Sequence, residues 1–232
     1  MKDIENAYKS EMEYKRLRAD GIKTLDLLDR VQEYGFDTLE EYFNDKIDYQ
    51  IKNTPFTFQE VYPENAAEEM MKMISKGEAG LLLMNTDKTV VYHGDGYYNK
   101  EYCVEHNIPV IEYLTIGGTL VASSGELSIG VCIPRDIDVS LDWLLHKIAD
   151  YLSQYEGEVI VDKNDLLING NKICGAAVYK DDKSFSAVAQ LSFDDKSELI
   201  RNICGANKGK NPSWLTNVTR EQCREALKKW LL

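Results

Sequence analysis

Asp162-Lys-Asn-Asp-Leu-Leu-Ile-Asn-Gly-Asn-Lys-Ile-Cys-Gly-Ala-Ala-Val-Tyr179 has the clearest structural pattern in the chain. Residues 166–168 and 176–179 are short apolar runs bounded by turn residues, which is typical of strands. Between them, residues 169–171 (Asn-Gly-Asn) predict a tight hairpin turn, because Asn and Gly tolerate the positive φ that such turns require. We therefore expect two neighbouring strands joined by a hairpin.

Three polar residues flank this predicted turn. Asn164 and Asp165 stand at the start of the first strand, and Lys172 comes early in the second. The hairpin should bring all three toward the same end of a sheet. An amide, a carboxylate and an ammonium gathered there suit a carboxylate substrate and a phosphate bound to magnesium, since Mg²⁺ prefers oxygen ligands supplemented by water and substrate.

The composition is that of an acidic globular protein. The 232 residues are 44% hydrophobic and 28% charged, with a formal net charge of −12. This charge argues against nucleic-acid binding, which needs a basic face. No apolar run approaches the ~20 residues that span a bilayer, and the N-terminus does not resemble a signal peptide. We expect a cytoplasmic protein with neither a nucleic-acid nor a membrane partner.

The chain is expected to divide into a helical N-terminal segment, 1–55, and a domain formed by 56–232. Charged residues and helix formers dominate the first part, and the composition changes after Pro55. In the second part, the apolar runs 80–84 and 89–92 are expected to be paired strands. Helices are expected at 65–76, at 140–151 and after the capping box Thr219-Arg-Glu-Gln222. Together these elements predict an α+β fold, with a mixed, mostly antiparallel sheet packed with helices.

The hairpin resembles the Asn-Asp-(hydrophobic strand)-Gly-x-Lys-x-x-Gly motif of the lipoate–protein ligase and biotin–protein ligase superfamily. Upstream, residues 101–110 (Glu-Tyr-Cys-Val-Glu-His-Asn-Ile-Pro-Val) resemble the segment that precedes the family's Arg-Arg-x-Ser-Gly-Gly-Gly loop. Residues 115–127 (Thr-Ile-Gly-Gly-Thr-Leu-Val-Ala-Ser-Ser-Gly-Glu-Leu) then fall where lipoate ligases carry that loop. The resemblance covers roughly residues 65–191.

This resemblance implies an enzyme that activates lipoate or a related acyl acid with ATP and Mg²⁺ and transfers it to a lysine of a lipoyl-type carrier domain. Lys172 would be the catalytic lysine, contacting the acyl carboxylate and the phosphate of the acyl-adenylate, where a positive charge stabilises the developing anion. Asp165 would help hold magnesium. The substrate- and nucleotide-binding residues would be Gly117, Gly118, Thr119, Asn164, Asp165, Gly175 and Ala176.

The sequence also departs from the family's pattern. The two arginines of the loop fall at Glu112 and Tyr113, its first glycine is Ile116, and the family's His-Asp pair becomes Ala122-Ser123. Replacing an arginine by a glutamate removes a bidentate phosphate donor and adds a repelling charge. A non-catalytic binding protein that kept the fold and lost adenylation is therefore an alternative.

A second alternative is an octanoyl or lipoyl transferase that acts without ATP. It would need a nucleophilic cysteine, for which Cys174 and Cys132 are the candidates. Cys174 is more simply a small, semi-buried strand residue. The Cys-x-x-x-Pro-Ser-Trp-Tyr-like loop of one transferase branch would fall at 157–163, where this chain has no cysteine. The five cysteines include no Cys-x-x-Cys pair, so neither disulfides nor a zinc site are indicated.

Overall fold

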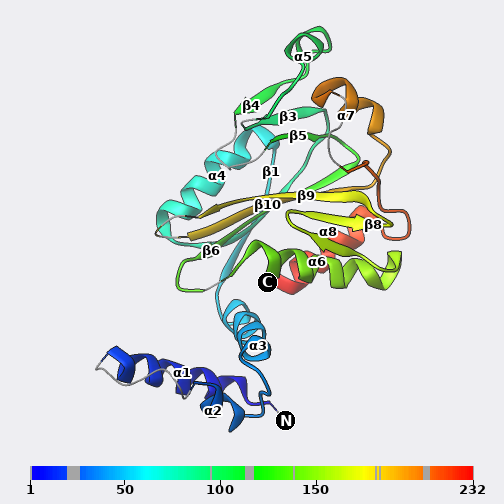
Figure 1. The fold of residues 1–232 in the computed structure, drawn as a ribbon. Helices are drawn as coiled ribbons and strands as arrows, with labels where there is room; N and C mark the ends of the chain where they lie inside the picture. Colours follow the sequence, from blue (N-terminus) through cyan, green and yellow to red (C-terminus); the bar gives the residue numbers. More distant parts are fainter. Residues whose placement is uncertain are drawn as a thin grey trace. The chain divides into compact units, whose positions relative to one another are not determined.

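The computed structural model describes residues 2–19, 27–94, 96–112, 118–137, 139–180, 182, 184–205 and 210–231. It divides into two compact units, Met1–Pro55 and Phe56–Leu232. The fold class predicted from the sequence, α+β with a mostly antiparallel sheet, is confirmed (Figure 1). Among the described helices, none is long and apolar enough to cross a membrane.

The first unit contains α1 (Ile4–Ala19), α2 (Leu27–Gln32) and α3 (Leu39–Lys52). Its core includes Phe36 and Tyr42, both fully buried. A buried ion pair joins Lys46 of α3 to Glu11 of α1 at 3.1 Å, and the Tyr42 hydroxyl donates to the same carboxylate at 2.5 Å. The Thr38 hydroxyl caps α3 by accepting a hydrogen bond from the Glu41 amide.

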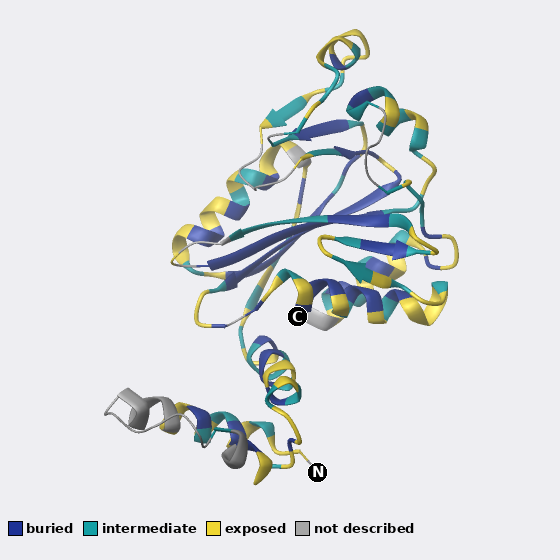
Figure 2. Cartoon of the chain, in the orientation of Figure 1, coloured by how far each residue is buried: buried dark blue, intermediate teal, exposed yellow. Residues whose placement is uncertain are grey.

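The second unit is built on a seven-stranded sheet. Only β1 and β2 run parallel, and every other neighbouring pair of this sheet is antiparallel. Its strands, in spatial order, are β1 (Phe56–Val61), β2 (Ala79–Met84), β6 (Glu126–Pro134), β10 (Ser184–Ser192), β9 (Asn171–Lys180), β8 (Asp165–Ile168) and β7 (Ile160–Asp162). The central strands β2, β6 and β10 are almost entirely buried (Figure 2).

A second sheet has three strands in the order β4 (Val110–Glu112), β3 (Val90–His93), β5 (Thr119–Ala122). The predicted pairing of 80–84 with 89–92 is therefore wrong, because β2 belongs to the large sheet and β3 to the small one. Both runs are apolar and buried, so periodicity alone could not assign a partner strand to either. Gln190 of β10 donates to the Val121 carbonyl of β5 at 2.6 Å, which ties the two sheets together.

The described residues of this unit also form five helices: α4 (Pro63–Lys76), α5 (Lys100–Glu105), α6 (Leu141–Glu156), α7 (Ser197–Cys204) and α8 (Arg220–Leu231). Helix α4 packs its methionines on the large sheet, where Gly130 lets it approach closely: a Cβ atom there would lie 3.1 Å from Met70 Sδ. Ser140 caps α6 as expected, accepting from the Trp143 amide at 3.1 Å.

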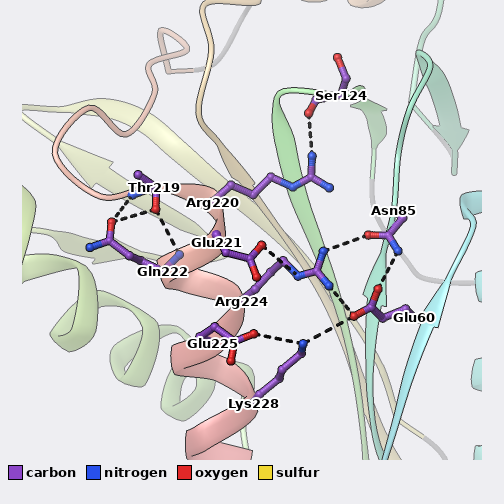
Figure 3. Close-up of polar contacts among 10 residues, drawn as sticks. All are labelled: Glu60, Asn85, Ser124, Thr219, Arg220, Glu221, Gln222, Arg224, Glu225 and Lys228. Carbon is purple, nitrogen blue, oxygen red and sulfur yellow. Dashed lines mark hydrogen bonds and ion pairs between the residues drawn. The ribbon is translucent and has the colours of Figure 1, made fainter.

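The C-terminal helix is anchored to the sheet by a polar cluster (Figure 3). Its capping box is reciprocal, as the sequence predicts: the Gln222 amide donates to the Thr219 hydroxyl, and the Thr219 amide donates to the Gln222 side chain. Further along α8, Arg224 pairs with Glu60 of β1 and also donates to Asn85 at 3.4 Å. Asn85 in turn donates to Glu60 at 3.1 Å, so one helix residue binds two neighbouring strands.

The predicted hairpin is formed by β8 and β9. Asn169 and Gly170 both adopt positive φ, 50° and 76°, as a tight two-residue turn requires. The register then shifts: Leu166 lies opposite Cys174, whereas Leu167 lies opposite Lys172, which leaves Ile173 as an extra residue. This β-bulge reorients the lysine, because regular alternation would put side chains 172 and 175 on opposite faces of the sheet.

Candidate active site

Lys172 lies over Gly175, which pairs directly with the buried Gln190 of the neighbouring strand β10. A Cβ atom on Gly175 would lie only 2.8 Å from Lys172 Nζ and 2.9 Å from its Cε, so the missing side chain provides the space for the lysine. The ammonium is held from the other side by Asp165, whose Oδ1 is 2.7 Å from Nζ. Asp165 pairs directly with Gly175 across β8 and β9. The bulge, the glycine and the carboxylate together fix the position of Lys172.

The backbone of Lys172 is held by a segment that follows α7. The Lys172 amide donates to the Asn211 carbonyl at 2.7 Å, and the Ser213 amide donates to the Lys172 carbonyl at 2.7 Å. The same segment carries Lys210, whose ammonium is 2.9 Å from Asp165 Oδ2. The sequence does not predict that Lys210 lies at this site, because no motif connects it with a hairpin some 40 residues earlier.

Two cavities meet at Lys172. The first has a volume of about 200 Å³ and a mainly apolar lining. The second has about 220 Å³ and includes charged groups of both signs. Four residues line both cavities: Thr119, Leu120, Lys172 and Gly175. The first is further lined by Met84, Tyr92, Gly94, Gly118, Ala176, Ala177 and Val188.

The floor of the second cavity crosses three neighbouring strands, β8, β9 and β10. Asp165 is paired with Gly175, and Gly175 with Gln190, and all three line the cavity. Because directly opposite residues in antiparallel strands point to the same face, these three positions form one row under the cavity. Lys172 reaches over the glycine of this row. A charged ligand would therefore meet an ammonium above and hydrogen-bonding groups on either side.

Glu126 lines the second cavity and is 1% exposed. Its carboxylate accepts hydrogen bonds from the Ser123 amide at 2.5 Å and from the Ser123 hydroxyl at 3.2 Å. Burial nevertheless dominates and raises the pKa of Glu126 to about 7, against the opposing charge of Lys196. This acid was not identified from the sequence, where it reads as the first residue of a strand.

The structure brings together most of the predicted site residues. Gly118, Thr119, Lys172, Gly175 and Ala176 line the first cavity, and Asp165 lines the second. The Thr119 hydroxyl donates to the Tyr97 carbonyl at 2.9 Å.

Asn164 is placed differently from the other predicted residues. It is exposed and is not among the described residues that line either cavity. Its backbone carbonyl accepts from the Ala176 amide at 2.8 Å, which supports the strand behind the site. Gly117 lies outside the described residues, as do Tyr113 and Ile116.

Three of the positions that depart from the family's loop, Glu112, Ala122 and Ser123, are described, and none of them lines either cavity. Glu112 is exposed at the end of β4. Ala122 of β5 is fully buried opposite Val90 of the neighbouring strand β3, and the Ser123 hydroxyl donates to Glu126. The described part of the site therefore relies on lysines for positive charge.

The two cysteines considered from the sequence, Cys174 and Cys132, are poor nucleophiles. Cys174 is 1% exposed and Cys132 is fully buried. Burial raises the pKa of Cys174 to about 12 and that of Cys132 to about 11. Both thiols are then protonated at neutral pH, and the thiol is far less nucleophilic than the thiolate.

Comparison with known proteins assigns the family. The model of the lipoyl protein ligase A/B catalytic domain matches residues 62–224. The chain belongs to this family. The match includes both cavities and Lys172, and it begins after the helical N-terminal unit. No curated protein matches the sequence.

Several solved structures share this fold. P. falciparum LipL1 in complex with lipoate is 15% identical, with a TM-score of 0.65 over 76% of this chain and 61% of that one. A lipoate–protein ligase A bound with ATP is 13% identical, with a TM-score of 0.62 over 76% of this chain and 83% of that one.

A further similar structure comes from an archaeal lipoylation system. It is a bipartite lipoate–protein ligase, with its E2 lipoyl domain, from Thermoplasma acidophilum. The identity is 14%, with a TM-score of 0.59 over 76% of this chain and 81% of that one. The present chain spans 61% of the LipL1 structure, so it corresponds to part of that protein.

Proposed function

We propose that this protein is a lipoate–protein ligase-like enzyme, which activates lipoate or a related acyl acid with ATP and transfers it to a lysine of a lipoyl-type carrier domain in the cytoplasm. The observation that carries the proposal is Lys172, which lines both an apolar and a charged cavity. An apolar chain would lie in the first cavity, with its carboxylate against the lysine. The nucleotide phosphate would lie on the charged side.

The proposed activity has two chemical steps. The acyl carboxylate oxygen attacks the α-phosphorus of ATP, a P–O bond forms, and pyrophosphate leaves with the electrons of the bond that breaks. The deprotonated amine of the carrier lysine then attacks the acyl carbonyl, an amide forms, and AMP leaves. Lys172 would stabilise the negative charge that develops on the carboxylate and phosphate oxygens in the first step. Gly118 would allow close approach of the backbone to the mixed anhydride.

Magnesium is proposed as a companion of ATP, because it usually binds through substrate phosphates and water. Asp165, however, does not fit a metal ligand as it stands: Oδ1 faces Lys172 and Oδ2 faces Lys210, both within 2.9 Å. No cluster of three or more His, Cys, Asp or Glu side chains suited to a metal occurs in the described part of the chain. We therefore assign no step to a metal held by this carboxylate.

Activation can be tested without a carrier. The protein is mixed with ATP, magnesium and either lipoate or octanoate, and pyrophosphate release and acyl-hydroxamate formation with hydroxylamine are measured. We expect both products, and we expect Lys172→Ala to lower the rate by about 10²–10³, the usual effect of removing one transition-state charge donor. Lys163→Ala, which alters an exposed lysine of the preceding turn, is the matched control. Absence of both products with every acid offered would refute the activation step.

Transfer needs a second measurement. A lipoyl domain added to the same mixture should gain the mass of the acyl group only when ATP is present. The bipartite Thermoplasma ligase motivates a parallel reaction with a separate accessory domain, since this chain spans only part of the LipL1 structure. If the protein activates the acid but transfers it to the lipoyl domain only after the accessory domain is added, the enzyme is a two-component ligase.

A non-catalytic acyl-binding protein is the second candidate. It is favoured by Glu112, which stands where the family's loop has an arginine and is exposed. This candidate predicts saturable binding of the acid, sensitive to Lys172→Ala, with no pyrophosphate released. A transferase that acts through Cys174 or Cys132 is disfavoured, because both thiols are buried and protonated.

A further inference from the structure

Lys210 occupies a cage of oxygen atoms beside the candidate active site. Its Nζ lies 2.7 Å from Asp162 Oδ2, 2.9 Å from Asp165 Oδ2 and 3.2 Å from the Asp162 backbone carbonyl. Two carboxylates and a carbonyl converging on one point form a donor set that hard divalent cations use. Here the point is filled by the ammonium group of the protein itself.

The ammonium is linked to Lys172 through a shared carboxylate. Asp165 accepts from Lys172 on Oδ1 and from Lys210 on Oδ2, so its charge is divided between two cations. The Lys210 hydrogen bond also holds the pKa of the Asp162 carboxyl below its usual range, so that Asp162 stays ionised. Because Lys210 shares the negative charge of Asp165, Lys172 keeps N–H groups available for an incoming anion.

The segment that delivers Lys210 also positions Lys172 through the backbone. Residues 211 and 213 bracket Lys172 with two hydrogen bonds of 2.7 Å each. An isolated parallel bridge between Lys172 and Pro212 marks the same contact. One short stretch of chain therefore controls the main chain of the lysine and the charge of its counter-ion.

We propose that Lys210 is a positioning residue of this site, whose ammonium stands where a divalent cation would otherwise bridge Asp162 and Asp165, and so holds Asp165 against Lys172. This proposal uses the proposed function only in taking Lys172 as the group that binds the acyl carboxylate. Lys210 contacts both aspartates, so we expect it to act on the acyl carboxylate through Asp165 and Lys172.

The test uses the full chain and Mn²⁺ as the probe, in the absence of nucleotide. Removing the ammonium by Lys210→Ala leaves the oxygen cage open, and we expect Mn²⁺ affinity to rise by about tenfold or more over that of the unchanged protein. Adding Asp162→Asn to this variant should abolish the gain. Lys210→Arg keeps the positive charge and should gain nothing, and Lys163→Ala controls for loss of a nearby lysine.

The second readout is the affinity for octanoate, measured by calorimetry. Lys210→Ala should weaken it by about tenfold, because Asp165 then competes undivided for Lys172, and Lys210→Arg should restore most of it. Intrinsic fluorescence checks that each variant is folded. The proposal is overturned by either of two results: an unchanged protein that binds Mn²⁺ through Asp162, or a Lys210→Ala variant with unchanged octanoate affinity.

These outcomes separate the proposal from the proposed function. If the unchanged protein releases no pyrophosphate but the two Lys210→Ala effects appear, ligase activity fails and the positioning role stands. If pyrophosphate is released and Lys210→Ala matches the unchanged protein in both readouts, only the positioning role fails.

Discussion

The buried acid Glu126 should make the second unit less stable as the pH rises. In the folded protein its pKa is raised to about 7, against 4.5 for the ordinary group. Below pH 4.5 the carboxyl is protonated in both the folded and the unfolded state, so its titration does not lower the free energy of unfolding. Between these two values the folded state holds a proton that the unfolded state has released, so the free energy of unfolding falls as the pH increases.

The size of this effect follows from the two pKa values. Each tenfold difference in proton affinity corresponds to 1.36 kcal/mol, so the loss is on the order of 3 kcal/mol once the pH exceeds 7. Glu126→Gln removes the titration while keeping an oxygen that accepts from the Ser123 amide. We therefore compare the free energy of unfolding of the variant with that of the unchanged protein at two pH values. The difference should be about 3 kcal/mol more favourable to the variant at pH 8 than at pH 4.5.

Urea unfolding followed by tryptophan fluorescence measures this difference. All three tryptophans of the chain, at 143, 214 and 230, lie in the second unit, so the signal reports on that unit alone. Glu105→Gln, at an exposed position of α5, is the control for removal of one carboxylate. A stability difference between Glu126→Gln and the unchanged protein that stays constant from pH 4.5 to pH 8 would refute the reasoning.

Three further changes have expected outcomes. Gly175→Ala would place a methyl group 2.8 Å from Lys172 Nζ and should raise the KM for the acyl acid, with unfolding free energy changed by less than about 1 kcal/mol; an unchanged KM would contradict this role of the glycine. Arg224→Ala removes the ion pair between Arg224 of α8 and Glu60 of β1 and should cost about 1–2 kcal/mol in urea unfolding, with the effect reduced in high salt. Cys174→Ser should leave acyl activation intact, because the buried thiol is not the nucleophile; trapping of a thioester that this change abolishes would reverse that conclusion.

The sequence predicted those parts of the fold that short-range chemistry controls. The Asn169-Gly170 turn, the Ser140 cap and the reciprocal Thr219–Gln222 capping box are all present in the structure. Each depends on residues within three or four positions of one another. Strand pairing depends on distant contacts, which is why β2 and β3 were assigned to each other and lie in different sheets.

The site was predicted in outline for the same reason. The lysine motif is contiguous, so Lys172 and Asp165 could be placed near one another, and their ion pair is observed. The bulge at Ile173 could not be read from an alternating pattern, although it decides the face to which Lys172 points. Lys210 and Glu126 reach the site through the folding of separate segments, and nothing in their immediate sequence marks them.

The two cavities share four lining residues but otherwise have different linings, one mainly apolar and one that includes charged side chains. Thr119, Leu120, Lys172 and Gly175 line both cavities, whereas Met84 and Val188 line only the apolar one. Changes in the size of the latter pair therefore alter the space for a hydrocarbon chain and leave the charged lining untouched. In the proposed ligase, the selectivity for the length of the acid could therefore change, or be redesigned, without changing the charged residues of the second cavity.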